Sequence, residues 1–115
     1  MTATRSHVVE RAGSGDYAPF IHRGKAVGEL RELTPDGAES TQLSAGLWRS
    51  VPAIYDYLFE ADEAFVVLEG AATVALPQTG ETVELAAGDV AYFLRGTPSV
   101  WTVTEPFLKF VVNPA

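Results

Sequence analysis

Short apolar segments recur along the chain, and turn residues separate them. Apolar or alternating stretches cover 26–33, 63–69, 72–76, 81–85, 90–94, 99–103 and 107–112. Segments of about five to eight residues, repeated roughly every ten residues, are typical of an all-β sandwich or barrel. No window shows a helical period over ten or more residues. We therefore expect an all-β fold in which Gly70 and the stretch 104–106 are turns between separate strands.

The strand pattern suits one domain with an irregular segment before it. Residues 1–24 contain the stretch GSGDYAPF and indicate an N-terminal arm with one short strand near Val8 and Val9. Residues 25–115 are assigned to a single β-barrel domain, since 115 residues are an ordinary length for one domain. The stretch TPDG at 34–37 predicts a turn, because Pro presets φ and Gly accepts positive φ.

Charge and composition exclude several kinds of partner. The net charge of −7 disfavours binding to nucleic acid and to anionic membrane surfaces. The chain has no cysteine, which excludes disulfides and thiolate metal sites. It has no apolar run of transmembrane length, and its first residues lack the apolar core of a signal peptide. We expect a cytoplasmic protein with neither nucleic acid nor membrane as a partner.

The stretch YDYLFEADEAFVVLEG, residues 55–70, combines aromatic residues with a carboxylate. Tyr55, Tyr57 and Phe59 stand at alternate positions, so a strand places their three rings on one face. Glu63 follows close behind them. The rings are either part of the barrel core or the wall of a small-molecule pocket.

Two motifs in this region resemble a known family. Glu63 and Gly70 frame E-x6-G, and Gly88 to Gly96 form G-x5-L-R-G. In this order and spacing they resemble the two motifs of the cupin superfamily. The stretch 44–112 is most similar to small single-domain cupins grouped with the cupin domain of (S)-ureidoglycine aminohydrolase and with the ethanolamine-utilisation cupins. The resemblance implies a jelly-roll β-barrel of two facing antiparallel sheets, with the ligand site inside the barrel.

The resemblance also implies a metal site, but the residues here differ from the family's ligands. The two histidines of the first motif fall on Tyr57 and Phe59, its carboxylate is kept as Glu63, and the histidine of the second motif falls on Ser99. A transition metal needs three or four N, O or S ligands, and only Glu63 is a strong one. We therefore expect that the metal site is lost and that no cofactor is bound.

A pocket without a metal can still bind a ligand. Tyr57 and Glu63 are the expected acid–base pair, and an aromatic cup around them would hold a flat or apolar molecule, or a cation against the ring faces. Arg49, Arg95 and Lys109 could reach the barrel mouth and meet an anionic ligand. The expected ligand-binding residues are Trp48, Tyr55, Phe59, Ser99 and Trp101.

These residues favour a small-molecule-binding cupin, and two alternatives remain open. One is a metal-independent enzyme, such as an isomerase, cyclase, lyase or hydrolase, that uses Glu63 and Tyr57 for proton transfer. The other is a metal-dependent cupin with a rearranged site, to which His7 or His22 of the arm contributes. We also expect a homodimer, because the edge strands of a jelly roll must be covered and the arm could exchange between copies.

Overall fold

Eight β-strands make up the regular structure of the computed structural model, which describes residues 6–35 and 42–114. These ranges contain no helix, and so none that could span a membrane. The all-β prediction is confirmed, while residues 36 and 37 of the predicted turn lie outside the described part. The strands are β1 (Ala18–His22), β2 (Lys25–Glu32), β3 (Leu43–Ser50), β4 (Ala53–Leu58), β5 (Glu63–Leu76), β6 (Glu81–Ala86), β7 (Val90–Phe93) and β8 (Pro98–Pro114).

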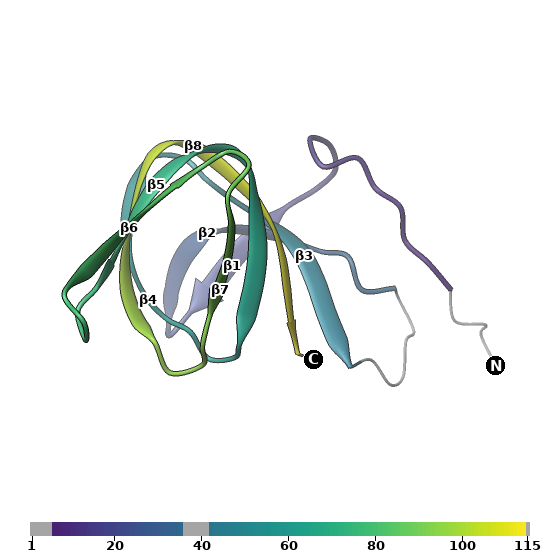
Figure 1. Ribbon diagram of the computed structural model, residues 1–115. Helices are drawn as coiled ribbons and strands as arrows, with labels where there is room; N and C mark the ends of the chain where they lie inside the picture. The colour runs from purple at the N-terminus through teal and green to yellow at the C-terminus, as the bar shows by residue number, and fades with distance from the viewer. Residues whose placement is uncertain (1–5, 36–41, 115) are drawn as a thin grey trace.

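Two long strands, β5 and β8, pass through both sheets of the barrel (Figure 1). In the first sheet, residues 107–114 of β8 pair with β3, and residues 63–66 of β5 pair with β7. β2 and β1 extend this sheet beyond β3. In the second sheet, residues 98–103 of β8 pair with β4, and residues 71–76 of β5 pair with β6. All pairs are antiparallel, and β5 and β8 join the two parts into one continuous eight-stranded sheet, which folds over as the expected jelly roll.

The two long strands bend where they pass from one sheet to the other. The prediction of a turn at Gly70 is wrong, because β5 continues through it with a φ of 86°. A Cβ at this position would collide with the carbonyl oxygen of Pro106 in β8, so glycine lets the two backbones approach. The pairing register shifts here, as in a β-bulge, and the predicted break at 104–106 is likewise an interior part of β8.

The N-terminal segment forms a hairpin with the barrel. The strand predicted near Val8 and Val9 is wrong, since residues 7–10 have no strand structure. β1 lies further along, at Ala18–His22, and pairs with β2 through the turn at Arg23 and Gly24. Both turn residues have positive φ, 52° and 83°, as a tight two-residue hairpin turn requires. This hairpin carries Phe20 and His22 to the barrel wall.

Aromatic side chains fill much of the barrel interior. Phe59 is fully buried and stacks on Phe93, with ring centroids 4.6 Å apart and 6° between the planes. Phe65 also stacks on Phe93, with ring centroids 6.0 Å apart. Trp48 and Trp101 meet edge to face at 6.0 Å. The packed end formed by the phenylalanines leaves a cavity beside the tryptophans.

Candidate functional site

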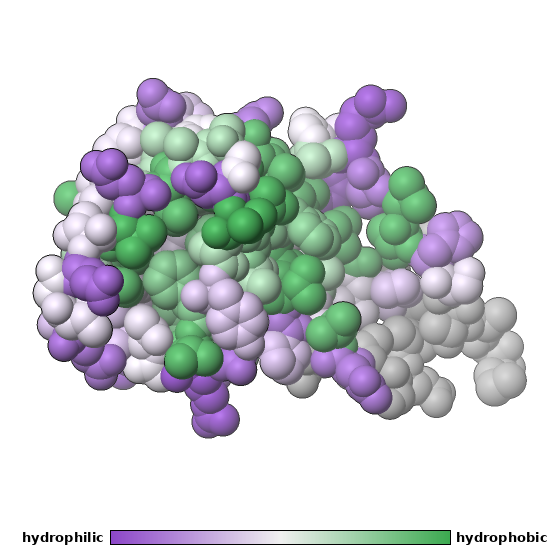
Figure 2. Space-filling view, in the orientation of Figure 1, coloured by the Kyte–Doolittle hydropathy of each residue, from purple (hydrophilic) through white to green (hydrophobic). Residues whose placement is uncertain are grey.

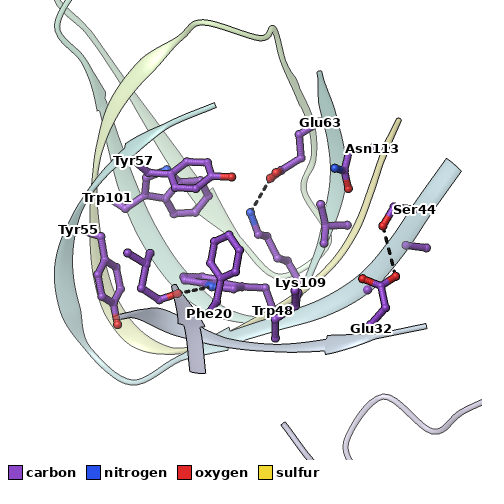
Figure 3. A pocket seen from close by; sticks show the side chains of 15 residues that line it. Phe20, Glu32, Ser44, Trp48, Tyr55, Tyr57, Glu63, Trp101, Lys109 and Asn113 are labelled. Atoms are coloured by element: carbon purple, nitrogen blue, oxygen red, sulfur yellow. Dashed lines mark hydrogen bonds and ion pairs between the residues drawn. The ribbon is translucent and has the colours of Figure 1, made fainter. Parts of the chain in front are cut away.

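A cavity of about 250 Å³ lies inside the barrel and has an aromatic wall with a charged pair. Exposed Glu32 and partly exposed Ser44 line one side, so the cavity reaches solvent there (Figure 3). The aromatic rings come from β1, β3, β4 and β8. The residues that matter for its chemistry are Phe20, Trp48, Tyr55, Tyr57, Glu63, Trp101 and Lys109.

Glu63 and Lys109 form a buried ion pair in this cavity. Lys109 Nζ donates to Glu63 Oε2 at 2.9 Å, and the two residues are 6% and 8% exposed. Figure 3 shows the two side chains reaching toward each other, and they come from the neighbouring, paired strands β5 and β8. Glu63 is the one hydrogen-bond partner that the described residues give to the ammonium group. Since an ammonium group carries three donors, two of its N–H groups remain available to a ligand.

Aromatic faces surround the ammonium group on its other sides. Lys109 Nζ lies 4.2 Å from the ring centre of Phe65, 4.6 Å from that of Trp101 and 5.2 Å from that of Trp48. Burial lowers the pKa of Lys109 below its usual value, and the neighbouring charge of Glu63 opposes this effect. The aromatic cup therefore holds the ammonium group of Lys109 against its ring faces, in the place where the sequence suggested the cation of a ligand.

Tyr57 points its hydroxyl group toward the ion pair (Figure 3). Burial raises the pKa of Tyr57 well above its usual value, and the negative charges of Glu63 and Glu60 raise it further. The phenol therefore stays protonated near neutral pH and can donate a hydrogen bond to a ligand. His22 packs on the ring of Tyr57 at 4.4 Å, and its Nε2 accepts the backbone N–H of Leu58 at 3.2 Å.

The structure brings five of the seven predicted site residues to the cavity: Trp48, Tyr55, Tyr57, Glu63 and Trp101. Trp48 is fixed by its Nε1, which donates to the carbonyl of Val27 at 2.8 Å, and Tyr55 by a 2.7 Å hydrogen bond to Ser50. The indole N–H of Trp101 is buried and has no partner within residues 6–35 and 42–114.

The other two predicted residues support the wall without lining the cavity. Phe59 is turned into the phenylalanine stack with Phe93. Ser99 is buried, and its hydroxyl donates to the carbonyl of Tyr57 at 2.6 Å. Their inward orientation agrees with the expected strand faces, but a ligand in this cavity would not meet them.

From the sequence, Lys109 was one of three basic residues that could reach the barrel mouth, and the structure places it buried inside the barrel. In β8, Phe107, Lys109 and Val111 alternate on the inward face, and all three are buried. A lone charged residue in an inward apolar row was the signal that could have located it. Arg49 instead pairs with Glu29 on the surface at 2.9 Å. Arg95 is exposed.

The arm histidines do not build a metal site with these residues. His7 is exposed and hydrogen-bonds to Ser6, and His22 is engaged with Leu58 and lies 3.6 Å from Glu60. Within the described residues, no group of three His, Cys, Asp or Glu side chains is close enough to hold a metal ion.

Comparison with known proteins identifies the kind of barrel. The family model described as an EutQ-like cupin domain matches residues 34–110, more than half of the chain. A putative ethanolamine utilization protein Q from Salmonella typhimurium is 22% identical, with 99% of this chain and 97% of that one covered and a TM-score of 0.72. The polyketide cyclase RemF from Streptomyces resistomycificus is 24% identical, covers 92% of this chain and 79% of its own, and gives 0.69.

A third similar structure is a DUF861-family protein from Thermotoga maritima. It is 26% identical, with 56% of this chain and 73% of that chain covered and a TM-score of 0.54. The search of curated proteins found no match.

Proposed function

This chain belongs to the EutQ-like cupin domain family, and we propose that its barrel binds a small, largely apolar molecule through an oxygen atom held by Lys109. The observation that carries the proposal is the buried ammonium group, which faces an aromatic cavity of about 250 Å³. Two of its N–H donors have no acceptor among the described residues. Burial of a donor without a partner is costly, so a ligand acceptor would stabilise the site.

The donors at the family's metal positions do not fit a divalent metal ion. Phe59 offers no donor atom and is stacked on Phe93, and the hydroxyl of Ser99 is bonded to the carbonyl of Tyr57. Glu63, the remaining carboxylate, is already neutralised by Lys109 at 2.9 Å. A metal ion here would also meet an ammonium charge within a few ångströms. These contacts support a cupin in which the metal-ligand histidines are replaced and a lysine supplies the positive charge.

The cavity lining favours one chemical class of ligand. Phe20, Trp48, Tyr55 and Trp101 offer ring faces to an apolar body. The Glu63–Lys109 pair has no net charge, but its free N–H donors and the hydroxyl of Tyr57 select an oxygen acceptor. A carbonyl or carboxylate compound of single-ring size combines both properties.

A metal-independent enzyme remains the second candidate, because Tyr57 and Glu63 meet beside the cavity. The raised pKa of Tyr57 keeps its phenol protonated and able to donate a hydrogen bond to a developing negative charge, while Glu63 is the group that can accept a proton. The polyketide cyclase among the structural neighbours is 24% identical, which shows the fold alone. The enzymatic alternative therefore rests on the contacts of the cavity.

Intrinsic fluorescence tests the binding proposal directly, because the chain has two tryptophans and both line the cavity. We expect cyclohexanone and cyclohexanecarboxylate to cause a saturable change, and methylcyclohexane, which has no oxygen, to bind at least about tenfold more weakly. A Glu63→Leu/Lys109→Met double variant, which has no polar hydrogen at either position, should lose this preference for oxygen compounds, while Arg49→Gln, which breaks a surface ion pair, should keep it.

Two results would contradict the proposal. One is the absence of any saturable change with all three compounds. The other is binding that disappears after dialysis against EDTA and returns with a stoichiometric divalent metal, because this would assign the oxygen-binding role to a metal ion.

A further inference from the structure

Lys109 has the surroundings of a reactive amine. Its Nζ lies in the wall of the cavity, where an apolar compound would place its oxygen-bearing carbon. The three neighbouring ring faces exclude water from the nitrogen, and Glu63 Oε2 stands 2.9 Å away. Desolvation favours the neutral amine, which is the nucleophilic form, and the carboxylate of Glu63 is placed to accept the proton that the ammonium group releases.

We infer that Lys109 condenses with a small aldehyde or ketone in this cavity to form a protonated imine. The inference deepens the proposed function, on which it rests, by making the bound oxygen that of a carbonyl group. Imine formation also gives the Glu63–Lys109 ion pair a role beyond binding. A neutral hydrogen-bond donor would be enough to hold the oxygen atom of a ligand, so binding alone does not require a buried ion pair.

The residues present can carry each proton of this step. Glu63 accepts one proton from the ammonium group, and the neutral Nζ forms a bond to the carbonyl carbon while the C=O electron pair moves to oxygen. The oxygen takes the proton that Glu63 accepted, either directly or through the hydroxyl of Tyr57, which Glu63 reprotonates in the same step, and a second proton leaves the nitrogen for the same oxygen. The C–O bond then breaks and water departs. Overall, one protonated amine and one carbonyl give one protonated imine and one water, with no oxidant or reductant.

The positions of the neighbouring groups match these roles. The Tyr57 hydroxyl points toward the pair, and burial keeps it protonated and able to donate to the oxygen. Burial likewise lowers the pKa of Lys109 and so favours release of its proton to Glu63. Glu32, the other charged group of the cavity, lies at the exposed side and accepts hydrogen bonds from the hydroxyls of Ser44 and Thr34.

The chain contains its own control, because it has two lysines. Lys25 begins β2 and is exposed, whereas Lys109 is buried. An exposed amine of ordinary basicity is almost fully protonated at pH 7 and reacts slowly. Reaction with cyclohexanone in the presence of sodium cyanoborohydride, which reduces imines to stable amines, therefore compares both lysines in one sample by peptide mass mapping.

At pH 7 we expect the peptide containing Lys109 to be modified at least about tenfold faster than the peptide containing Lys25. Lys25→Arg should leave the modification of Lys109 unchanged. In urea-unfolded protein the two lysines should react at the same rate, because both are then exposed.

Other outcomes overturn the inference. If cyclohexanone changes the tryptophan fluorescence while Lys109 remains unmodified, the imine is excluded and the binding proposal stands. If neither the fluorescence nor Lys109 changes, both fail. Equal modification of the two lysines in the folded protein would also contradict a special reactivity of Lys109.

Discussion

At the scale of single residues, the buried ion pair of Glu63 and Lys109 is the feature with the largest desolvation cost to offset. Removing an ammonium and a carboxylate group from water is unfavourable, and their attraction offsets this only while both are present. Here the attraction acts over 2.9 Å, and three aromatic faces add to it. The pair should therefore matter more for stability when one partner is removed than when both are.

We predict that Lys109→Met lowers the free energy of unfolding by about 3–5 kcal/mol, because Glu63 is left buried without a counter-charge. A Glu63→Leu/Lys109→Met double variant should recover most of this loss. Urea unfolding of the two variants and the wild type measures the difference. A double variant that is less stable than Lys109→Met alone would contradict this account of the pair.

The same pair should leave a signature in the dependence of stability on pH. The pKa of Lys109 is lower in the folded protein than its usual value of 10.5, so between these two values the unfolded chain binds more protons. Stability should therefore rise with pH in that window. The Glu63→Leu/Lys109→Met double variant should lack the rise. Denaturant midpoints at pH 8, 9 and 10 would show it, and a flat wild-type profile would count against the lowered pKa.

Tyr57 should act in the opposite direction at higher pH. Its pKa is raised above the usual value of 10.0, so above pH 10 the folded protein keeps a proton that the unfolded chain loses. Stability then falls as the pH rises further. Tyr57→Phe should remove this contribution, and the decline above pH 10 in the unfolding midpoint should be smaller than in the wild type.

At the scale of elements, the bend shared by β5 and β8 shapes the barrel and the cavity. Gly70 and Gly80 both have positive φ, 86° and 74°, but only Gly70 faces a backbone carbonyl, that of Pro106. Gly70→Ala should cost about 2 kcal/mol or more, from backbone strain and the collision together. Gly80→Ala, which meets open space, should cost only about 1 kcal/mol. Thermal unfolding of the two variants compares them, and equal losses would contradict the role of the close approach.

The bend also explains what the sequence could and could not predict. The alternation of apolar residues predicted the strands, and the resemblance to the cupin motifs implied the inward faces of Tyr57, Glu63 and Trp101. A glycine between two apolar segments indicates a turn and a bulge equally well, because the difference depends on a partner strand about 35 residues further along. The sequence around Gly70 alone therefore could not predict that this glycine lies in a bend within one strand.

The predicted turn at 104–106 also explains why the inward position of Lys109 was not predicted. Counting by two along β8 from Trp101 gives Val103, then Glu105 in the exposed bend, then Phe107 and Lys109, and all of these except Glu105 are buried. The predicted turn at 104–106 interrupted this count. His22 was missed for another reason, since its place beside Tyr57 depends on the β1–β2 hairpin folding back onto the barrel.

At the scale of the whole molecule, the outer face of β7 remains open. Val90 and Tyr92 of β7 and Leu94 directly after it are 78%, 62% and 64% exposed, and β7 pairs with β5 alone in the described part of the chain. Figure 2 shows hydrophobic side chains gathered over the barrel face on which β7 lies in Figure 1. Exposed apolar patches and free strand edges favour association.

We predict that a second copy of the chain covers this face in a homodimer. Val90→Lys should then shift the molar mass measured by light scattering from that of a dimer to that of a single chain, with a change in stability within about 0.5 kcal/mol. Ile54→Lys, at a 71% exposed position on β4, is the matched control and should leave the dimer intact. A wild-type protein of single-chain mass at micromolar concentration would contradict the prediction.

The arrangement of β8 has a consequence for how the protein is made. β3, β4 and β5 each pair with β8, which spans residues 98–114 and is the last strand to be synthesised among those described. Until the ribosome has released this strand, the three earlier strands have open edges and the barrel cannot close. Folding must therefore wait for the end of translation of this region, and the nascent chain is most exposed to aggregation and to chaperone binding just before that point.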